Sequence, residues 1–187
     1  MPAPAAGLSP YLVAVGRGVQ NYTCDLSNAT AVPKSIGALA SLFNVSCIAA
    51  NQPDLLAKLP EIALNLPVPD TTSDPSSPAA VDLVGHHYFI DDFTTPFFNL
   101  DTASHSYGMG AFKVVGNMKA PSSAMVGQYN KGDGAVAWLK LDAKSQDAQV
   151  FQEVYRLNTA GGLPPKMCTG MPPEFSVEYA AEYWFWS

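Results

Sequence analysis

The alternation of side chains near the C-terminal end of the chain constrains the fold more than any other feature. Residues at odd positions are mostly apolar: Phe175, Val177, Tyr179, Ala181, Tyr183 and Phe185. Residues at even positions begin polar and end with two tryptophans: Ser176, Glu178, Ala180, Glu182, Trp184 and Trp186. Because successive side chains of a strand point to opposite faces, this pattern predicts a strand whose odd positions face the core. We also expect something to cover the tryptophan end of the other face.

Further stretches of strand composition recur along the chain, separated by turns rich in glycine and proline. They lie at 13–15, 19–24, 81–90, 105–115, 135–141 and 150–158, with an interruption expected at Gly16 and Gly18. Residues 38–47 fit either a bent strand or a helical turn. Residues 55–66 fit a short helix capped by Asp54 and interrupted by Pro60. The sequence therefore predicts an all-β chain, specifically an immunoglobulin-like β-sandwich with long loops and one or two short helical turns.

The length of 187 residues fits a single domain spanning 1–187. The longest run of low complexity, 67–80, is rich in proline and serine and is expected to form an exposed loop.

Charge and composition exclude several functions. The net charge is -6, and no basic stripe is present to neutralise phosphates, so we expect no nucleic-acid partner. No stretch approaches the roughly 20 apolar residues of a membrane span. Hydrophobic residues make up 48% of the chain and charged residues only 14%. We therefore expect part of the apolar surface to be buried against a ligand or a second subunit.

Sequons and cysteines point to a secreted protein. Asn21, Asn28 and Asn44 each begin an acceptor sequence for glycosylation. The three cysteines, Cys24, Cys47 and Cys168, predict one disulfide and one free or intermolecular thiol. Cys168 could pair with Cys24 or with Cys47, and the sequence does not choose. We expect an extracellular protein in its mature form, without its signal peptide.

The histidines are the first candidates for chemistry. His86 and His87 are adjacent and therefore diverge on a strand, so a metal site would need one of them with His105 or a nearby aspartate. The sequence has no Gly-x-Ser-x-Gly nucleophile elbow and no dinucleotide fingerprint in the required context. A metal-dependent secreted enzyme using His86, His87 and His105 is thus an alternative rather than the leading hypothesis.

An apolar cluster is the stronger candidate. Aromatic and methionine side chains of this kind line adaptable pockets for apolar ligands, although they also form ordinary cores. The candidate ligand-binding residues are Phe93, Phe97, Phe98, Tyr107, Met109, Phe112, Met118, Met125 and Trp138. The three methionines lie in stretches rich in glycine, serine and lysine, which favours a pocket. The phenylalanines around residues 94–96 resemble a turn that presents aromatics to a pocket or a partner.

Six segments carry a resemblance to a known family. They are 16–24 (GRGVQNYTC), 85–89 (GHHYF), 95–101 (TPFFNLD), 134–141 (GAVAWLKL), 154–162 (VYRLNTAGG) and 179–185 (YAAEYWF). Together they resemble a family of secreted fungal proteins, with relatives in bacteria and plants, that is described as a domain of unknown function. Members are often labelled malate dehydrogenase, a label that the missing dinucleotide fingerprint gives no reason to accept here.

Within that family the chain looks most like the pink mushroom chromoproteins. The resemblance implies a linear polyene pigment held in a β-sandwich that assembles as an intertwined homodimer. The leading expectation is therefore a secreted, non-enzymatic chromoprotein that holds a polyene or similar apolar chromophore in a hydrophobic pocket. Besides the metal-dependent enzyme, a cell-surface interaction protein without a small ligand is a further alternative.

Overall fold

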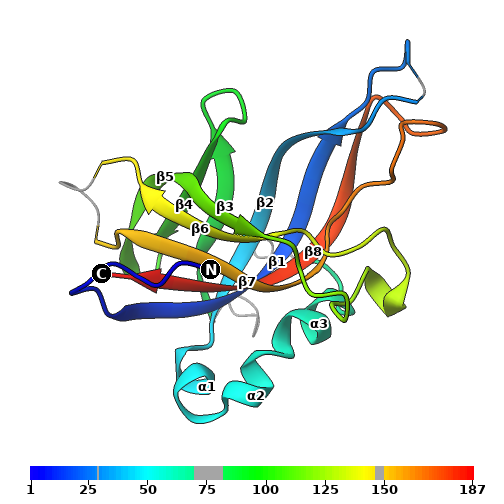
Figure 1. Ribbon diagram of the computed structural model, residues 1–187. Coiled ribbons are helices and arrows are strands. Elements are labelled where there is room, and N and C mark those ends of the chain that lie inside the picture. Colours follow the sequence, from blue (N-terminus) through cyan, green and yellow to red (C-terminus); the bar gives the residue numbers. More distant parts are fainter. Residues whose placement is uncertain (29, 70–81, 146–149) are drawn as a thin grey trace.

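A computed structural model describes residues 1–28, 30–69, 82–145 and 150–187 (Figure 1). Its strands are β1 (Pro10–Thr23), β2 (Lys34–Asn44), β3 (Leu83–Ile90), β4 (Thr95–Asp101), β5 (Ser106–Met118), β6 (Trp138–Ala143), β7 (Glu153–Gly161) and β8 (Glu174–Trp186). Three short helices follow β2: α1 (Ser46–Asn51), α2 (Pro53–Leu56) and α3 (Leu59–Leu64). A single 3₁₀ turn, η1 (Gln128–Asn130), precedes β6.

The strands form one closed barrel. Each strand pairs antiparallel with the next along the chain, and β1 pairs with β8 to close the sheet. The predicted all-β chain with a few short helices is confirmed. The immunoglobulin-like sandwich is wrong, because β1 hydrogen-bonds along its length to both β2 and β8 and so joins what would have been two separate sheets.

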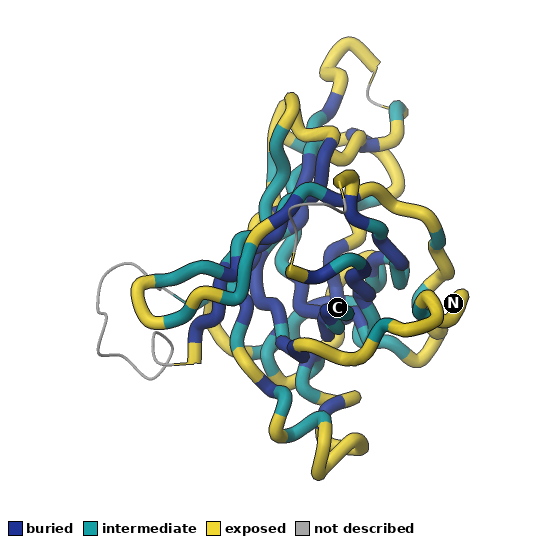
Figure 2. Tube along the Cα trace, turned by 90° about the vertical axis from the view of Figure 1, so that its left-hand side faces the viewer, coloured by how far each residue is buried: buried dark blue, intermediate teal, exposed yellow. Residues whose placement is uncertain are grey.

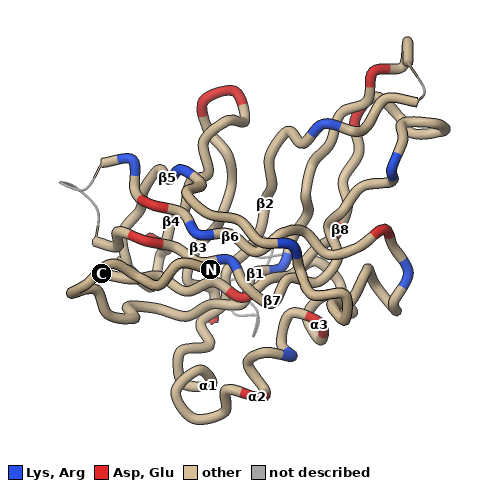
Figure 3. Tube along the Cα trace, in the orientation of Figure 1, with Lys and Arg blue, Asp and Glu red and all other residues tan. Residues whose placement is uncertain are grey.

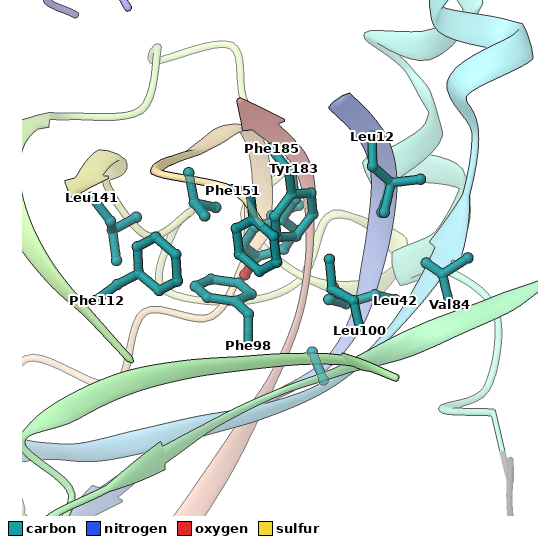
Figure 4. Close-up of a cluster of buried hydrophobic side chains, with 14 of the residues drawn as sticks. Leu12, Leu42, Val84, Phe98, Leu100, Phe112, Leu141, Phe151, Tyr183 and Phe185 are labelled. Carbon is teal, nitrogen blue, oxygen red and sulfur yellow. The ribbon is translucent and has the colours of Figure 1, made fainter. Parts of the chain in front are cut away.

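The alternation predicted for β8 places Tyr179 to Phe185 in the core as expected, whereas Phe175 and Val177 are only half-buried and lie outside the main core. Tyr179, Ala181 and Phe185 are fully buried and Tyr183 nearly so. These side chains belong to the main core, which fills the barrel together with aromatic and aliphatic residues from the other strands. In Figure 4 the ring of Phe98 lies among those of Phe112, Phe151 and Tyr183, and it meets Phe112, Tyr183 and Phe185 edge to face.

Two glycines explain why β1 is continuous where the sequence predicted an interruption. A Cβ at Gly16 would lie 2.6 Å from Cε2 of Tyr183, and one at Gly18 would lie 1.9 Å from the carbonyl oxygen of Leu39. Both glycines therefore permit close packing inside a strand rather than ending it.

The helices cover the outer face of the sheet below β1 and β8 (Figure 1). Pro60 lies in the first turn of α3, where proline is tolerated, so it begins this helix instead of interrupting one. Asp54 lies in the first turn of α2 rather than at its cap, which is Gln52. Trp184 packs against the cluster of Val13, Val45 and Leu56. The expected cover over this end of β8 is thus supplied by the same chain.

Residues 1–9, called here the N-terminal strap, cross the outer face of the barrel. Lys140 Nζ donates to the carbonyl oxygen of Ala3 at 3.0 Å, and Tyr155 Oη donates to that of Pro2 at 3.0 Å. The amide of Ala5 donates to Glu153 Oε1 at 3.2 Å. Because Lys140 and Glu153 also form a salt bridge of 3.0 Å, the strap rests on a charged pair that it helps to bury.

A disulfide joins two loops at the far end of the long strands. Cys24 follows β1 and bonds to Cys168, which precedes β8, while Cys47 on α1 is a free and exposed thiol. One bridge and one free cysteine were predicted, and this is confirmed. In Figure 1 the long strands β1, β2 and β8 project beyond the rest of the barrel toward this end. Most residues of these end loops are exposed (Figure 2).

No helix in the described ranges has the length and apolar character needed to cross a membrane. Of the loop expected at 67–80, residues 70–80 lie outside the described residues, while 67–69 are irregular and mostly exposed.

Candidate functional site

A cavity of about 270 Å³ lies inside the barrel and is the best candidate for a binding site. Its walls come from six of the eight strands, β3 to β8, so barrel closure itself builds it. The apolar part of the wall consists of Phe89, Pro96, Phe98, Phe112, Leu139 and Leu141. An eight-stranded barrel is the size at which the interior is either filled by side chains or holds one small ligand.

The cavity opens to solvent beside β5. Phe112 is fully buried, yet Val114, two residues further on the same face, is 47% exposed and still lines the cavity. At Val114 the inner face of β5 therefore passes from the core to the surface. We call this opening of the cavity the mouth. Lys113 and Lys144 border the cavity here, and Lys144 Nζ donates to Oγ1 of Thr95. Lys113 pairs with Asp142 on β6, so charges of both signs lie near the mouth of this protein, whose net charge is -6 (Figure 3).

His87 is a buried polar group in the cavity wall. Its ring stacks on that of Phe98 with 4.3 Å between centroids, and its Nδ1 lies 3.0 Å from the carbonyl oxygen of Phe97. Burial lowers the pKa of His87 to about 4, an effect that the Phe97 hydrogen bond opposes and the Arg156 cation reinforces. The imidazole is therefore neutral at physiological pH.

Tyr183, Tyr179 and Arg156 add a polar network to the interior. The hydroxyls of Tyr179 and Tyr183 lie 3.0 Å apart, and burial raises the pKa of both. Arg156 lines the cavity and donates through Nε and Nη2 to the carbonyl oxygen of Ala137, at 3.2 Å and 2.9 Å. The interior thus combines a largely apolar wall with a few oriented polar groups, as ligand sites generally do.

The structure brings only part of the predicted ligand-binding set to this cavity. Phe98 and Phe112 line it. Phe97 lies on the opposite face of β4 and packs against Tyr88 with 5.3 Å between ring centroids. Tyr107 packs against the core and pairs with Tyr11 and His105, but it does not line the cavity.

The other five predicted residues lie elsewhere. Phe93, Met109 and Met118 are 61%, 45% and 42% exposed. The turn that carries Phe93 spans residues 91–94, one step before the phenylalanines of β4, and presents that ring to solvent. Met125 packs with Leu64 and Ala160 beneath α3, and Trp138 borders a separate cleft beside Ala57 and Glu61. The methionines that favoured a pocket in the sequence therefore lie at the exposed surface of β5 and beneath α3.

Several residues of the cavity wall were missed from the sequence. Leu139 and Leu141 lie on one face of β6, and their spacing of two was a usable signal. Arg156 carried no such signal, because a charged residue at an inward position is recognised only once the sheet is closed.

The three histidines do not converge on a metal site. His87 faces the cavity, whereas His86 pairs with Asn99 on the neighbouring strand and is half-buried, and burial lowers its pKa. His105 stacks on Tyr107, outside the cavity wall. Within the ranges that the structure describes, no three histidine, cysteine, aspartate or glutamate side chains gather closely enough to hold a metal ion.

The sequons lie on the surface. Asn28 and Asn44 are exposed, and Asn21 is half-buried on β1, where its side-chain oxygen accepts a hydrogen bond from Ser176 at 2.7 Å. Residue 29, inside the second sequon, lies outside the described residues. Glycosylation of all three asparagines stays a prediction.

Comparisons with known proteins give a single result. No curated protein and no solved structure matches the chain. A family described as "Protein of unknown function (DUF3455)" matches residues 4–187, nearly the whole chain. The predicted membership of a family of unknown function is confirmed, whereas a fungal origin and a chromoprotein role stay predictions. The chain belongs to the DUF3455 family.

Proposed function

We propose that this protein is a secreted, non-enzymatic carrier that holds a linear polyene or similar apolar chromophore in the barrel cavity. The observation that carries the proposal is the cavity itself, whose wall of aromatic and aliphatic side chains opens to solvent at Val114. A conjugated chain entering there would stack on Phe98 and Phe112, two of the residues predicted to contact the ligand.

The size of the cavity decides how such a ligand would sit. Ligand pockets usually measure about 300–1,000 Å³, and this one, at about 270 Å³, is slightly smaller. It accommodates one end of a long polyene, and the remainder would run out through the mouth. Burial would contribute about 25 cal/mol per Å² of apolar surface.

The charges around the cavity would shift the absorption maximum of a bound chromophore. Lys113 and Lys144 border the mouth and Arg156 lies deeper. Positive charges near one end of a conjugated chain stabilise electron density there and so change its absorption maximum. A low-dielectric interior strengthens this effect.

The disulfide supports secretion, because such bonds persist mainly in oxidising compartments. The exposed positions of Asn28 and Asn44 leave both available to a glycosyltransferase. We propose glycosylation at Asn21, Asn28 and Asn44, and peptide mass spectrometry before and after enzymatic deglycosylation tests it.

The direct test is an absorption spectrum of protein purified from its natural source. We expect absorption in the visible range, and we expect an organic solvent to extract the colour and leave colourless protein. Colourless native protein that yields no apolar molecule on extraction would contradict the proposal.

A matched pair of variants tests the location. Val114 and Val115 are adjacent on β5 and similarly exposed, at 47% and 46%, but only Val114 lines the cavity. With a fluorescent linear tetraene as probe, Val114→Trp should abolish binding by filling the mouth. Val115→Trp should bind like the unmodified protein. Equal binding by both variants would place the probe elsewhere.

We also propose a homodimer, possibly intertwined. Its support is the exposure of large apolar side chains, among them Leu39 on β2 and Phe93 in the turn before β4, which are 52% and 61% exposed. Trp184 does not contribute to this support, because it packs against Val13, Val45 and Leu56 of the same chain. Analytical ultracentrifugation tests the proposal: we expect a dimer that Leu39→Asp weakens and Val150→Asp, at a distant exposed site, does not.

A further inference from the structure

His87 offers the cavity a hydrogen-bond acceptor. The carbonyl oxygen of Phe97 can only accept, so the Nδ1 atom that lies 3.0 Å from it must carry the proton. In a neutral imidazole the other nitrogen, Nε2, is then unprotonated and accepts. The tautomer is therefore fixed by a backbone atom of β4.

The position of the ring directs this acceptor inward. One face of the ring is covered by Phe98, and the Nδ1 edge is bound to Phe97. His87 is only 4% exposed, yet it lines the cavity, which leaves the edge carrying Nε2 as the part that a ligand meets. The ring's hydrogen bond within the described residues is made at Nδ1, so a ligand in the cavity that supplies a donor to Nε2 gains affinity.

The neighbouring polar groups already make contacts within the protein. Arg156 uses Nε and Nη2 on the carbonyl oxygen of Ala137, and the hydroxyl of Tyr183 pairs with that of Tyr179. His87 is thus the group in the wall that most clearly selects between ligand ends.

We propose that the inner end of the ligand carries a hydroxyl-type hydrogen-bond donor, which His87 Nε2 accepts. This inference rests on the proposed function, because it assumes that the cavity holds an apolar chain. It adds the chemical class of the ligand, which is an apolar alcohol whose hydroxyl is buried and whose chain is directed to the mouth.

The test compares three linear conjugated tetraenes of equal length that end in a hydroxyl, a methoxy or a carboxylate group. Their affinities are measured at pH 7 by fluorescence titration of the whole protein. The alcohol should bind about tenfold more tightly than the methyl ether, because the ether leaves Nε2 without a donor.

His87→Asn is the discriminating variant. The asparagine amide keeps a donor for the Phe97 carbonyl but places no acceptor where Nε2 lies. We expect this variant to bind the alcohol about tenfold more weakly and the ether unchanged. His105→Asn, which alters a histidine outside the cavity wall, should change neither affinity. Near-ultraviolet circular dichroism confirms that both variants are folded.

The outcomes separate the two proposals. If none of the three probes binds, the proposed function fails and this inference fails with it. If all bind but the alcohol and the ether are equal in the unmodified protein, the cavity is a ligand site and the role of His87 is overturned. Tighter binding of the carboxylate, unaffected by His87→Asn, would assign the inner end to Arg156 and would also overturn the inference.

Discussion

At the scale of single residues, a few polar side chains are buried and make specific hydrogen bonds. Arg17 is 2% exposed on the outer side of β1 and donates to the carbonyl oxygens of Leu64 and Leu66, at the end of α3. It also pairs with Glu178. The guanidinium thus donates to carbonyls at the end of α3, where Gln128 Nε2 also donates to the carbonyl oxygen of Leu64 at 2.9 Å.

Replacing Arg17 tests this role. A lysine keeps the charge but lacks the planar fork of donors, so Arg17→Lys should lower the free energy of unfolding by roughly 2–4 kcal/mol. Urea unfolding followed by tryptophan fluorescence measures the loss. Glu178→Gln is the control: because the Glu178 side chain is 41% exposed, this change should have little effect. Equal losses in both variants would assign the stability to the ion pair instead.

His87 gives the protein a pH-dependent stability. Its pKa is about 4 in the folded state, below the usual 6.5, so between these values the unfolded chain binds a proton that the folded chain does not. Stability should therefore fall as pH falls from about 6.5 to about 4, by about 2 kcal/mol between pH 7 and pH 5. Urea unfolding at both pH values checks this. In His87→Asn this part of the slope should vanish, and an unchanged slope would refute the assignment.

Part of this residue-scale picture was accessible from the sequence. The period of two separates His86 from His87, and the structure confirms that separation. The sequence could not predict which of the two histidines faces the interior. The inward position of His87 depends on its pairing with Ala40 and Phe98 in neighbouring strands. The exposed methionines show the limit of composition: Met109 and Met118 are apolar, but their positions on β5 leave them in solvent.

At the scale of elements, the N-terminal strap is held by polar contacts rather than by a core. Lys140 and Glu153 are 8% and 6% exposed and bind the strap through Ala3 and Ala5. For Lys140, burial lowers the pKa, but the hydrogen bonds to Glu153 and Tyr155 outweigh it, and the pKa is raised overall. The pair and the strap therefore depend on each other.

A double-mutant series tests that dependence. Lys140→Met leaves the Glu153 carboxylate buried without its partner and should destabilise the protein by about 3 kcal/mol. The double variant Lys140→Met with Glu153→Leu should be more stable than Lys140→Met alone, because no charge remains buried. Thermal unfolding compares the three proteins. Greater instability of the double variant would show that the charges themselves hold the strap.

Sequence patterns predicted the elements unevenly. The alternation in β8 identified this strand, because Tyr179, Ala181, Tyr183 and Phe185 all enter the core. β1 was read as broken, since Gly16 and Gly18 usually mark bends, and their close contacts with Tyr183 and β2 are visible only after folding. The sequence also predicted a turn around residues 94–96, because proline often marks turns, but Pro96 lies within β4 at a position beside the cavity.

At the scale of the whole molecule, closure of the sheet distinguishes the barrel from the predicted sandwich. The strand compositions are the same in both architectures, so no local pattern separates them. What separates them is the pairing of β1 with β8, between residues as distant as Val15 and Glu182. The cavity wall combines residues from β3 to β8, which meet only in the folded sheet, and this explains why the sequence predicted two of its wall residues as ligand contacts but not the site as a whole.

The disulfide reinforces this closure. Cys24 and Cys168 are 144 residues apart, so their bond removes much of the conformational freedom of the unfolded chain. Cys24→Ser with Cys168→Ser should lower the free energy of unfolding by roughly 4 kcal/mol. Differential scanning calorimetry without reductant measures it. Cys47→Ser, at the exposed free thiol, should change stability by less than about 0.5 kcal/mol.

The pairing of β1 with β8 also has a consequence for biosynthesis. Residues 10–23 leave the ribosome long before residues 174–186, and until then β1 has one edge without its partner strand. An unpaired strand edge is a template for aggregation, and non-local pairing of this kind is slow. Chaperones that shield exposed strand edges should therefore raise the yield of this protein, and the barrel can close only after β8 has been synthesised.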